Sequence, residues 1–538
     1  MSKLHNKPVM AAIVILSSTT VMAITTGDLI LASKSPSIWP PAILERPVMQ
    51  KTFDSGNFKI HYDTVGANAV YRVDEDINPE DGVPDYINNM ASFLEMARYT
   101  YLVELGFDMP PPDDGQGGDD RYDIFVSNIA GLTVPESESD YYQGREAYTS
   151  YSFIGKDLRT GNHPNDPLPF LKATCAHEYF HAVQMAYRAY SADETAWWYE
   201  LTANWAEERV FDDLNEVYYY LGDYYNKTNY SIYLTGGAHM YGGWIFAEYL
   251  SQNYGNDLIK MIFDKMINFE RSLDAIVTSL AEHDLKLNTE FAKFSCWNYF
   301  TEENSMPGFY EESQDFPATI PIVANHSAYP TGWIDGGRKI ENLGSACIRF
   351  DNPGLNKGNL IVEFEGDPIH AEELCLAAVY STGYVRLTTN PITAGNHIEM
   401  KVENFNSCEF AVLSINYAYQ GASAHDSAGY RYYAILDTAH VDIEPDITQP
   451  EAFELIGNYP NPFNLSSNII FYWNSDATDY TISIYDIMGR EIEMFTGSPV
   501  VGLNRINWKA PENLASGAYF YKLVIGDINT SGRMLLLK

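Results

Sequence analysis

The chain has 538 residues, of which 46% are hydrophobic and 14% aromatic, and its formal net charge is −38. This length exceeds what one hydrophobic core supports, so we expect three or four domains, and the hydrophobic fraction excludes wholesale disorder. The negative charge repels nucleic-acid phosphates and anionic membrane surfaces, so neither is an expected partner.

The first 23 residues have the pattern of a signal peptide. Two lysines precede an apolar run from Val9 to Leu16, and residues 21–23 fit a cleavage site. The run is shorter than the roughly 20 apolar residues that a membrane anchor needs. We therefore expect export of a mature chain without a transmembrane segment. Residues 24–50, which contain several prolines, are expected to be an irregular leader or propeptide.

Hydrophobic periodicity predicts mixed helix and sheet over residues 51–315. A strand is expected in NFKIHYDT, a helix from Asp85 to Leu105, and a buried strand in YDIFVSNI. Residues 171–310 are mostly helical in pattern. The clearest helices are LKATCAHEYFHAVQMAYRAY, ETAWWYELTANWAEERVF and GGAHMYGGWIFAEYLSQNYG.

The rest of the chain has the pattern of β-sandwiches. Short alternating runs separated by Gly, Asn and Pro predict one sandwich over residues 320–445. The linker DIEPDITQPEAFE then leads to residues 454–538, where six or seven short strands predict a small Ig-like sandwich.

The five cysteines do not indicate a disulfide scaffold. They stand at 175, 296, 347, 375 and 408 without a CxxC pair. An odd number cannot be fully paired within one chain. The sequence leaves open one or two bridges, for which Cys347, Cys375 and Cys408 are candidates.

The residues His177-Glu178-Tyr179-Phe180-His181 form an HExxH motif. On a helix, positions i and i+4 share one face, so both imidazoles can reach one metal ion. Zinc binds His nitrogen and carboxylate oxygen, and a catalytic zinc keeps one position for water. Glu178 lies beside that face, where it can act as a general base towards this water. The alternatives are a chance match and a helix with buried polar histidines.

A third ligand is predicted at Glu200. Eighteen residues separate it from His181, and it lies within the helical pattern TAWWYELTANWAEE. This is the spacing of the gluzincin metallopeptidases. A carboxylate among so many apolar neighbours is costly unless it is paired or metal-bound. The alternative is a helix-surface residue beside Glu207 and Glu208.

The segments ATCAHEYFHAVQMAY and WWYELTANWAEERVFDD resemble a family of secreted bacterial metallopeptidases, best known from myxobacteria and defined largely by its motif. The shared pattern is HE-aromatic-aromatic-H-x-x-Q followed by W-x-x-E-x-x-A-x-W, which covers Glu178, Gln184, Glu200, Ala203 and Trp205. DGVPDYI and GGDDRYDIFV also resemble this family, so the likeness runs from about residue 51 to 310. It implies a zinc-dependent mechanism rather than a particular substrate.

Two further site residues follow from the gluzincin pattern. Many gluzincins have Asp four residues after the Glu ligand, where this chain has Asn204, an amide that can still accept a hydrogen bond from a ligand histidine. The mechanism also needs a proton donor to the oxyanion, which usually comes from a later helix. Tyr233, His239 and Tyr241 are the candidates, and we favour Tyr241.

Two acidic loops are candidate calcium sites. The first spaces oxygen ligands two apart and includes a Gly turn, at Asp74, Asp76, Asn78, Asp81 and Asp85. It lacks the full EF-hand spacing, and its alternative is a solvated acidic turn. The second loop is acidic at Asp113, Asp114, Asp119 and Asp120. A Ca²⁺ ion bound in either loop would brace it rather than do chemistry.

The last segment carries a second resemblance. YPNPFN at 459–464 is followed by IIFYW, TISIYDIMGREI, LNRINWKA, SGAYFYKLVIG and RMLLLK. This series is similar to the C-terminal sorting domains of the type IX secretion system of Bacteroidetes and their relatives. The resemblance implies that machinery as a partner and a secreted or outer-membrane surface-attached location. The alternative is a plain β-domain that only stabilises the protein.

Together these features predict a multidomain chain. An α+β zincin-like catalytic domain precedes a β-sandwich domain and a small C-terminal Ig-like β-sandwich. The predicted function is hydrolysis of peptide bonds in extracellular protein by a zinc-activated water, with Glu178 as general base. One alternative is a non-catalytic cell-surface adhesin or glycan- or protein-binding protein with a metalloprotease-like core. Another is a zinc hydrolase of a different amide or an ester.

Overall fold

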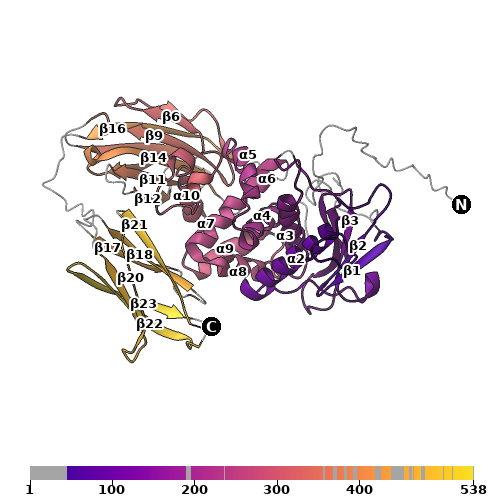
Figure 1. Cartoon of the computed structure of the whole chain (residues 1–538). Coiled ribbons are helices and arrows are strands. Elements are labelled where there is room, and N and C mark those ends of the chain that lie inside the picture. The colour runs from indigo at the N-terminus through magenta and orange to yellow at the C-terminus, as the bar shows by residue number, and fades with distance from the viewer. Residues whose placement is uncertain are drawn as a thin grey trace.

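The computed structural model describes residues 45–538, with gaps at 161, 189–195, 235–236, 355–357, 367–371, 381–384, 392–396, 419–425, 438–452, 460–462, 464–465, 474–478, 501, 512 and 537–538. The predicted signal peptide and residues 24–44 of the predicted leader lie outside the described residues. The described chain combines helices with several sheets in separate domains, which confirms the predicted fold class at that level (Figure 1). No described helix is long and apolar enough to cross a membrane.

The N-terminal part is built on a five-stranded sheet of order β1-β2-β3-β5-β4. Its strands are β1 (Lys51–Ser55), β2 (Phe58–Tyr62), β3 (Tyr122–Ser127), β4 (Gly131–Glu138) and β5 (Tyr148–Gly155). The three central strands run parallel, and β1 and β4 are antiparallel strands at the two edges.

The two faces of this sheet are covered differently. Ile124 and Val126 of β3 join the large core that α2 (Asp85–Tyr99) and α3 (Leu168–Gln184) form with the sheet. Phe125 between them points to the opposite face, as the period of two along a strand requires. There it packs in a smaller cluster with Tyr151, against which Met49 of the N-terminal segment lies.

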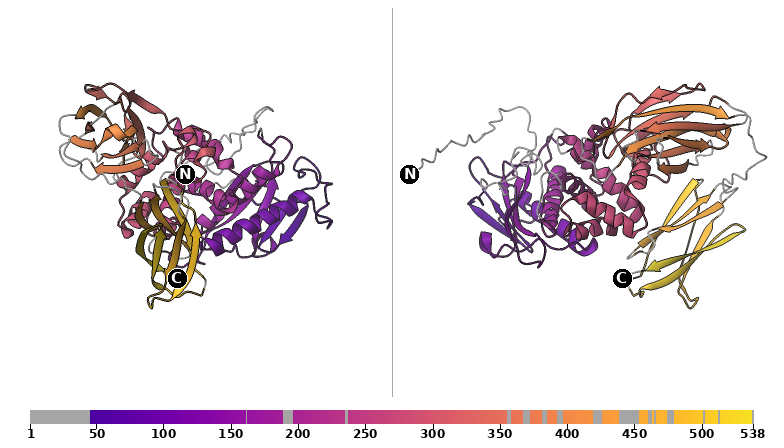
Figure 2. Two further views of the ribbon diagram at one scale, coloured as in Figure 1. Left: turned by 60° about the vertical axis from the view of Figure 1, so that its left-hand side comes forward. Right: turned by 180° about the vertical axis from the view of Figure 1, so that it is seen from behind.

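A helical layer follows the sheet, and in Figure 2 it separates the sheet from the two β-rich domains. After α2 comes the π-helical turn η1 (Thr100–Glu104), so the predicted helix from Asp85 to Leu105 is confirmed. The helices after α3 are α4 (Ala196–Val210), α5 (Leu221–Tyr225), α6 (Ala238–Gly242), α7 (Trp244–Tyr254), α8 (Asn256–Met266), α9 (Ser272–Glu282) and α10 (Leu287–Trp297). Short helical turns are η2 (Gln116–Gly118), η3 (Glu216–Tyr220), η4 (Glu302–Asn304) and η5 (Ser313–Asp315).

One predicted helix is in fact two. The segment GGAHMYGGWIFAEYLSQNYG forms α6 and α7, which are separated at Gly243. The neighbouring Gly242 packs closely on η3, because an added Cβ would lie 2.5 Å from the backbone oxygen of Tyr220. Only a glycine allows this close approach of two backbones. The helix therefore ends at the glycine pair, although the hydrophobic periodicity continues through it.

The second part is a β-sandwich, as predicted. Its main sheets have the orders β12-β11-β14-β9-β6 and β13-β10-β16-β7, and a small β15-β8 pair lies beside them. The elements are β6 (Ile322–His326), β7 (Ile334–Asp335), β8 (Ile340–Glu341), β9 (Gly344–Asp351), β10 (Asn359–Gly366), β11 (Glu372–Tyr380), β12 (Val385–Pro391), β13 (His397–Val402), η6 (Phe405–Ser407), β14 (Cys408–Tyr417), β15 (Ser427–Ala428) and β16 (Tyr430–Asp437). The outer face of the five-stranded sheet packs on α10 and joins the large core of the helical part.

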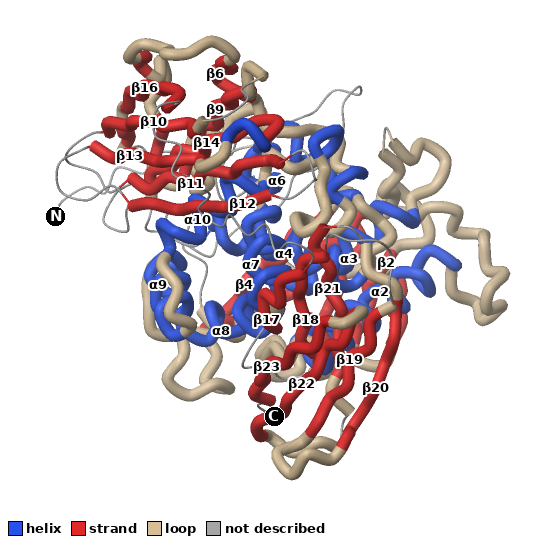
Figure 3. Tube along the Cα trace, turned by 90° about the vertical axis from the view of Figure 1, so that its left-hand side faces the viewer, coloured by secondary structure: helices blue, strands red, loops and turns tan. Residues whose placement is uncertain are grey.

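The C-terminal domain is a second, smaller sandwich with its own core. Its sheets are β17-β18-β21 and β20-β19-β22-β23 (Figure 3). The strands are β17 (Phe453–Tyr459), β18 (Ser466–Trp473), β19 (Tyr480–Tyr485), β20 (Glu491–Gly497), β21 (Gly502–Lys509), β22 (Gly517–Ile525) and β23 (Ile528–Leu536). Arg505 of β21 donates a hydrogen bond of 2.8 Å to the backbone oxygen of Gly308 and lies over the ring of Trp297, so this domain contacts the helical part.

Candidate metal centre

Helices α3 and α4 bring the three predicted metal ligands together. The Nε2 atoms of His177 and His181 are 3.1 Å apart, and Oε2 of Glu200 lies 3.5 Å from the first and 3.7 Å from the second. His177 is 8% exposed and the other two are fully buried. Among the described residues, these three form the only group of three or more His, Cys, Asp or Glu side chains close enough to hold one metal ion.

The outer nitrogens of both rings are occupied. Nδ1 of His177 lies 2.8 Å from Oε1 of Glu207, a carboxylate that accepts, so this nitrogen carries the proton. Nδ1 of His181 lies 2.8 Å from Oε1 of Gln184. The amide nitrogen of Gln184 donates to the backbone oxygen of Tyr199, which fixes Oε1 as the acceptor. In the neutral rings both Nε2 atoms therefore present lone pairs to each other.

Glu200 completes a cluster of three electron-pair donors without a hydrogen between them. Neither of its carboxylate oxygens accepts a hydrogen bond of ordinary geometry from a described residue. Burial raises the pKa of Glu200, and positive charge on His181 and His177 would lower this pKa by more, to about 2. A buried, ionised carboxylate facing two lone pairs is costly. A tetrahedral zinc with bonds of about 2.0–2.1 Å needs ligand atoms about 3.3 Å apart, so this donor set fits that metal.

Glu178 lies next to the cluster and is held by the edge strand β4. Its Oε2 accepts a hydrogen bond of 2.8 Å from the hydroxyl of Thr133. The backbone of β4 passes close by, because a Cβ added to Gly131 would collide with Oε1 of Glu178. Burial raises the pKa of Glu178, while the imidazoles of His181 and His177 and the Thr133 hydrogen bond lower it, and the net result is a raised value.

A small hollow that opens to solvent is lined by His177 and Glu178. Tyr241 lines it, and its ring centre is 6.3 Å from that of His177. The two other candidate proton donors point elsewhere. The ring of Tyr233 packs on Trp197 at 4.6 Å, and Nε2 of His239 lies 3.2 Å from the backbone oxygen of Ser231. Of the three candidates, the structure places Tyr241 at the site.

The prediction that Asn204 supports a ligand histidine is wrong. Its side-chain amide donates a hydrogen bond of 3.0 Å to the backbone oxygen of Tyr241. The hydrogen bond to Nδ1 of His177 comes instead from Glu207, for which the sequence pattern predicts no role. Glu207 lies seven residues after Glu200, two helical turns further along the same face of α4, and this spacing is the signal that could have identified it.

The structure does not bring the candidate calcium ligands together. The two carboxylate oxygens of Asp76 accept backbone hydrogen bonds from Asp81 and Gly82, at 2.9 and 2.8 Å. Asp85 accepts from the backbone of Ile77 and Asn78, at 2.9 and 3.0 Å. These carboxylates close the turn itself. In the second loop, Asp119 pairs with Lys59 and Arg121. Asp74 and Asp114 join no metal-holding group within the described part of the chain.

The end of the predicted leader is bound to the outer face of the sheet through Arg46. Its guanidinium makes two bonds to Glu136, at 2.8 and 2.6 Å, and one of 2.5 Å to Asp113. It also pairs with the buried Asp123. Burial, only partly offset by Arg46, raises the pKa of Asp113 to about 6. Three carboxylates therefore share one cation here.

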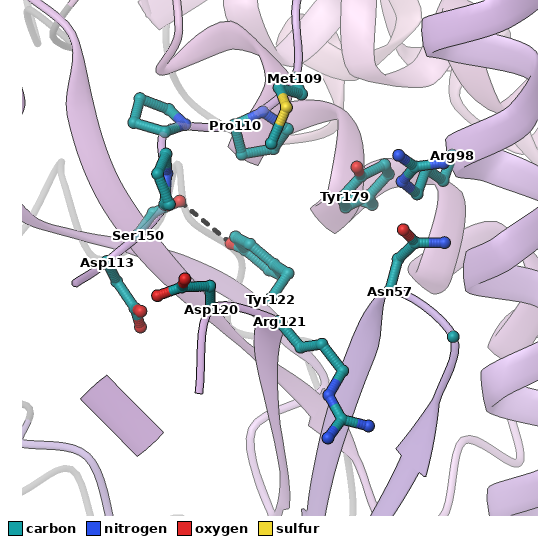
Figure 4. Close-up of a pocket in the computed structure, with 13 residues that line it drawn as sticks. Asn57, Arg98, Met109, Pro110, Asp113, Asp120, Arg121, Tyr122, Ser150 and Tyr179 are labelled. Atoms are coloured by element: carbon teal, nitrogen blue, oxygen red, sulfur yellow. Dashed lines mark hydrogen bonds between the residues drawn. The ribbon is translucent and has the colours of Figure 1, made fainter. Parts of the chain in front are cut away.

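A chain of hydroxyl groups connects Glu178 with a second hollow, shown in Figure 4. In that hollow Tyr122 and Ser150 are 3.1 Å apart. The hydroxyl of Tyr122 lies 2.9 Å from that of Ser152, which lies 2.8 Å from that of Thr133. The hydroxyl of Thr133 also lies 2.8 Å from the backbone oxygen of Glu178, so its one proton is shared between two acceptors of that residue. Because each hydroxyl has one proton, every donor in the chain points towards Glu178.

Comparison with known proteins identifies two segments. A model described as a family of unknown function (DUF6055) matches residues 166–313, which include α3, α4 and the candidate ligands. A model described as a secretion system C-terminal sorting domain matches residues 458–536, the small C-terminal sandwich. No curated protein matches the chain.

Solved structures resemble only parts of the chain. A β-glucuronidase of Parabacteroides merdae is 11% identical over 36% of this chain and 27% of its own, with a TM-score of 0.15. Dimeric latent PorU of Porphyromonas gingivalis is 16% identical over 36% of this chain and 20% of its own, also with a TM-score of 0.15. The chain thus spans well under a third of the length of either protein, and likeness of this degree says nothing about activity.

Proposed function

Because this chain ends in a type IX sorting domain and reaches the cell surface or the medium, we propose that it acts there as a zinc metallopeptidase. His177, His181 and Glu200 would hold the zinc, and Glu178 would be the general base. The substrate class is extracellular protein.

The observation that carries this proposal is the inward-facing set of lone pairs. Glu207 and Gln184 accept hydrogen bonds from Nδ1 of the two histidines. In the neutral rings both Nε2 atoms and the carboxylate of Glu200 therefore converge without a proton donor between them. Such an arrangement repels itself unless a proton or a metal ion lies in its centre. Burial lowers the pKa of His177, but Glu200 and Glu207 raise it well above its ordinary value. Two imidazoles and one carboxylate are also a ligand set that catalytic zinc uses.

The residues around the cluster support hydrolysis rather than a purely structural metal. Zinc bound there would polarise the scissile carbonyl of the substrate and lower the pKa of a zinc-bound water. Glu178 would take a proton from the attacking water and deliver it to the leaving amine. Tyr241, on the wall of the hollow, would donate a hydrogen bond to the oxyanion that develops on the substrate.

The first test is the zinc content of the purified mature protein beside a His177→Ala variant. We expect about one zinc per chain in the wild type and at least a tenfold loss in the variant, since a ligand is removed. His397→Ala, a change of an exposed histidine in the middle sandwich, is the matched control and should keep the zinc. Folded wild-type protein that stays metal-free when zinc is supplied would overturn the proposal and favour a surface-binding protein.

The second test is hydrolysis of fluorescently labelled casein. Glu178→Gln should keep the zinc and lose activity by about 10²–10⁴-fold, because only the proton transfer is removed. A protein that binds zinc but hydrolyses no protein would point to another amide or an ester, and a panel of such compounds would follow. Equal activity of Glu178→Gln and wild type would contradict the assigned base.

A further inference from the structure

The hollow in Figure 4 lies near the first residues of the parallel strands β3 and β5. Its walls come from these strands, the turn after β1, the end of α2, the loop before η2, and α3. Its volume is about 130 Å³, and none of the described residues lines both this hollow and the one at the metal centre. It is therefore a second candidate binding site, separate from the proposed zinc.

One end of the hollow presents hydrogen-bond donors. Tyr179 is 2% exposed, and its ring is held by edge contacts with Phe58 and Tyr122, at centroid distances of 5.0 and 5.7 Å. Its hydroxyl makes no hydrogen bond with a described residue, which is costly for so buried a group. Arg98, at the end of α2, lies beside it in Figure 4 and pairs with no described carboxylate. Burial raises the pKa of Tyr179, and the positive charge of Arg98 offsets part of that rise. A neutral hydroxyl and a guanidinium can therefore donate together to one anionic group.

The other end of the hollow presents acceptors. Ser150 gives its one proton to the hydroxyl chain described above, so its oxygen can only accept from a bound molecule. Asp113 is 7% exposed, and its Oδ1 is buried without a hydrogen-bond partner among the described residues. Asp120 is an exposed carboxylate that pairs with no described cation. In Figure 4 these three side chains lie on the opposite side of the hollow from the two donors.

The space between the two ends suits a small organic molecule. Pro110 is a buried apolar wall, and the ring of Tyr122 lies opposite it in Figure 4. A cavity of about 150 Å³ holds benzene, so this volume suits a molecule of about six heavy atoms. The second arginine of the walls, Arg121, is already bound by Asp54 and Asp119. The unpaired charges of the described walls are therefore a guanidinium at one end and a carboxylate at the other.

We propose that this hollow binds a free α-amino acid in its zwitterionic form. The carboxylate of the amino acid accepts hydrogen bonds from the hydroxyl of Tyr179 and the guanidinium of Arg98. Its ammonium group donates to Ser150 and to the carboxylates beside it. The inference is independent of the proposed zinc chemistry, since the candidate metal ligands take no part in this site.

The test is isothermal titration calorimetry of L-alanine, which has the required size, into the purified protein. We expect one binding event per chain with a Kd of about 1 mM or below. Two close analogues separate the charges, because propionate lacks the ammonium group and alaninamide lacks the carboxylate. Each should bind at least about tenfold more weakly, since one end of the hollow loses its partner. Absence of binding up to about 20 mM alanine, or equal binding of either analogue, overturns the inference.

Variants test whether the alanine binds in this hollow. Tyr179→Phe removes only the hydroxyl and should raise the Kd about 10–100-fold, because a hydrogen bond to a charged group is lost. Tyr99→Phe, at an exposed tyrosine of α2, is the matched control and should leave the Kd unchanged. His177→Ala should also keep the Kd. An unchanged Kd in Tyr179→Phe, or loss of binding in His177→Ala, would place the alanine elsewhere and overturn the inference. The comparison of alanine with its two analogues decides the question for the wild-type protein even if a variant fails to fold.

Discussion

Thr133 is the residue through which the sheet reaches the carboxylate of Glu178. It is fully buried, and behind it the hydroxyls of Ser152, Tyr122 and Ser150 all donate in the same direction. Hydrogen bonds aligned in this way polarise one another, and a carboxylate at the end of such a chain is held in one orientation. Thr133 is therefore a positioning residue for the proposed general base.

We expect Thr133→Val to lower kcat about 10–100-fold with little change in KM, because a hydrogen bond to a charged group contributes about 1.5–3 kcal/mol. The measurement is hydrolysis of labelled casein, with the zinc content checked in parallel. Thr133→Ser keeps the hydroxyl and should recover most of the activity. An unchanged kcat in Thr133→Val would show that Glu178 needs no such support.

Some site residues could be predicted from the sequence, and others could not. His177, Glu178, His181 and Glu200 stand at fixed spacings on two helices, and spacing is readable from sequence. The partner of His177 depends on how α4 is rotated against α3. Asn204 and Glu207 both lie on α4, and only packing decides which of them faces the imidazole. The roles of Thr133 and Gly131 depend on a strand some 45 residues away and left no local signal.

At the scale of elements, helix α4 carries three buried carboxylates, Glu200, Glu207 and Glu208. Glu208 is 5% exposed, and its pKa is raised to about 9 by burial and by repulsion from Glu248 and Glu207. A carboxyl whose pKa is higher in the folded state binds its proton more tightly there. Its contribution to stability is complete below about pH 4.5 and is lost as the pH rises to about 9.

We expect Glu208→Gln to remove this pH dependence. The variant should unfold like the wild type at pH 5 and should be about 2–4 kcal/mol more stable at pH 8, which corresponds to a Tm about 5 °C higher. Thermal unfolding at the two pH values is the measurement. Glu303→Gln, at an exposed position, is the control and should show no such difference. An equal gain in Tm at pH 8 in both variants would contradict a raised pKa at Glu208.

The prediction of elements succeeded where one period extends over a long segment. Helices α2, α3 and α4 and strands β2 and β3 were expected at their places, since each has a continuous periodic pattern. The break between α6 and α7 was missed because a glycine pair inside an apolar helical pattern does not by itself reveal that Tyr220 lies against it. The first calcium loop was predicted from the spacing of its oxygen ligands and a glycine turn, and the second from its acidic residues. In the structure Asp76 accepts backbone hydrogen bonds and Asp119 pairs with cationic side chains.

At the scale of the whole molecule, export and the proposed chemistry reside in different domains. The small C-terminal sandwich has a core of its own, and Arg505 makes its hydrogen bond to the helical part. The family model for sorting domains covers this sandwich, whereas the candidate metal ligands lie within residues 166–313. Loss of the sandwich should therefore change where the protein goes.

We expect a chain that lacks residues 454–538 to accumulate in the periplasm. Cell fractionation and immunoblotting are the measurements. Arg505→Ala is the matched control, since it removes the contact with Gly308 but keeps the sorting domain, and it should still be exported. Appearance of the truncated chain in the medium would contradict a sorting role for this domain.

The ionic cluster of Arg46 sets a limit on maturation by proteolysis. The predicted leader extends to residue 50, yet removal of all of it would strip Asp113, Asp123 and Glu136 of their shared counterion. Three neighbouring carboxylates on one face of the sheet would then repel one another. They would have to bind protons or become solvated, which costs stability at this buried position. A cut on the N-terminal side of Arg46 avoids this penalty. We therefore expect a maturation cut, if the leader is removed, to fall on the N-terminal side of Arg46, so that Asp113 and Glu136 keep their counterion.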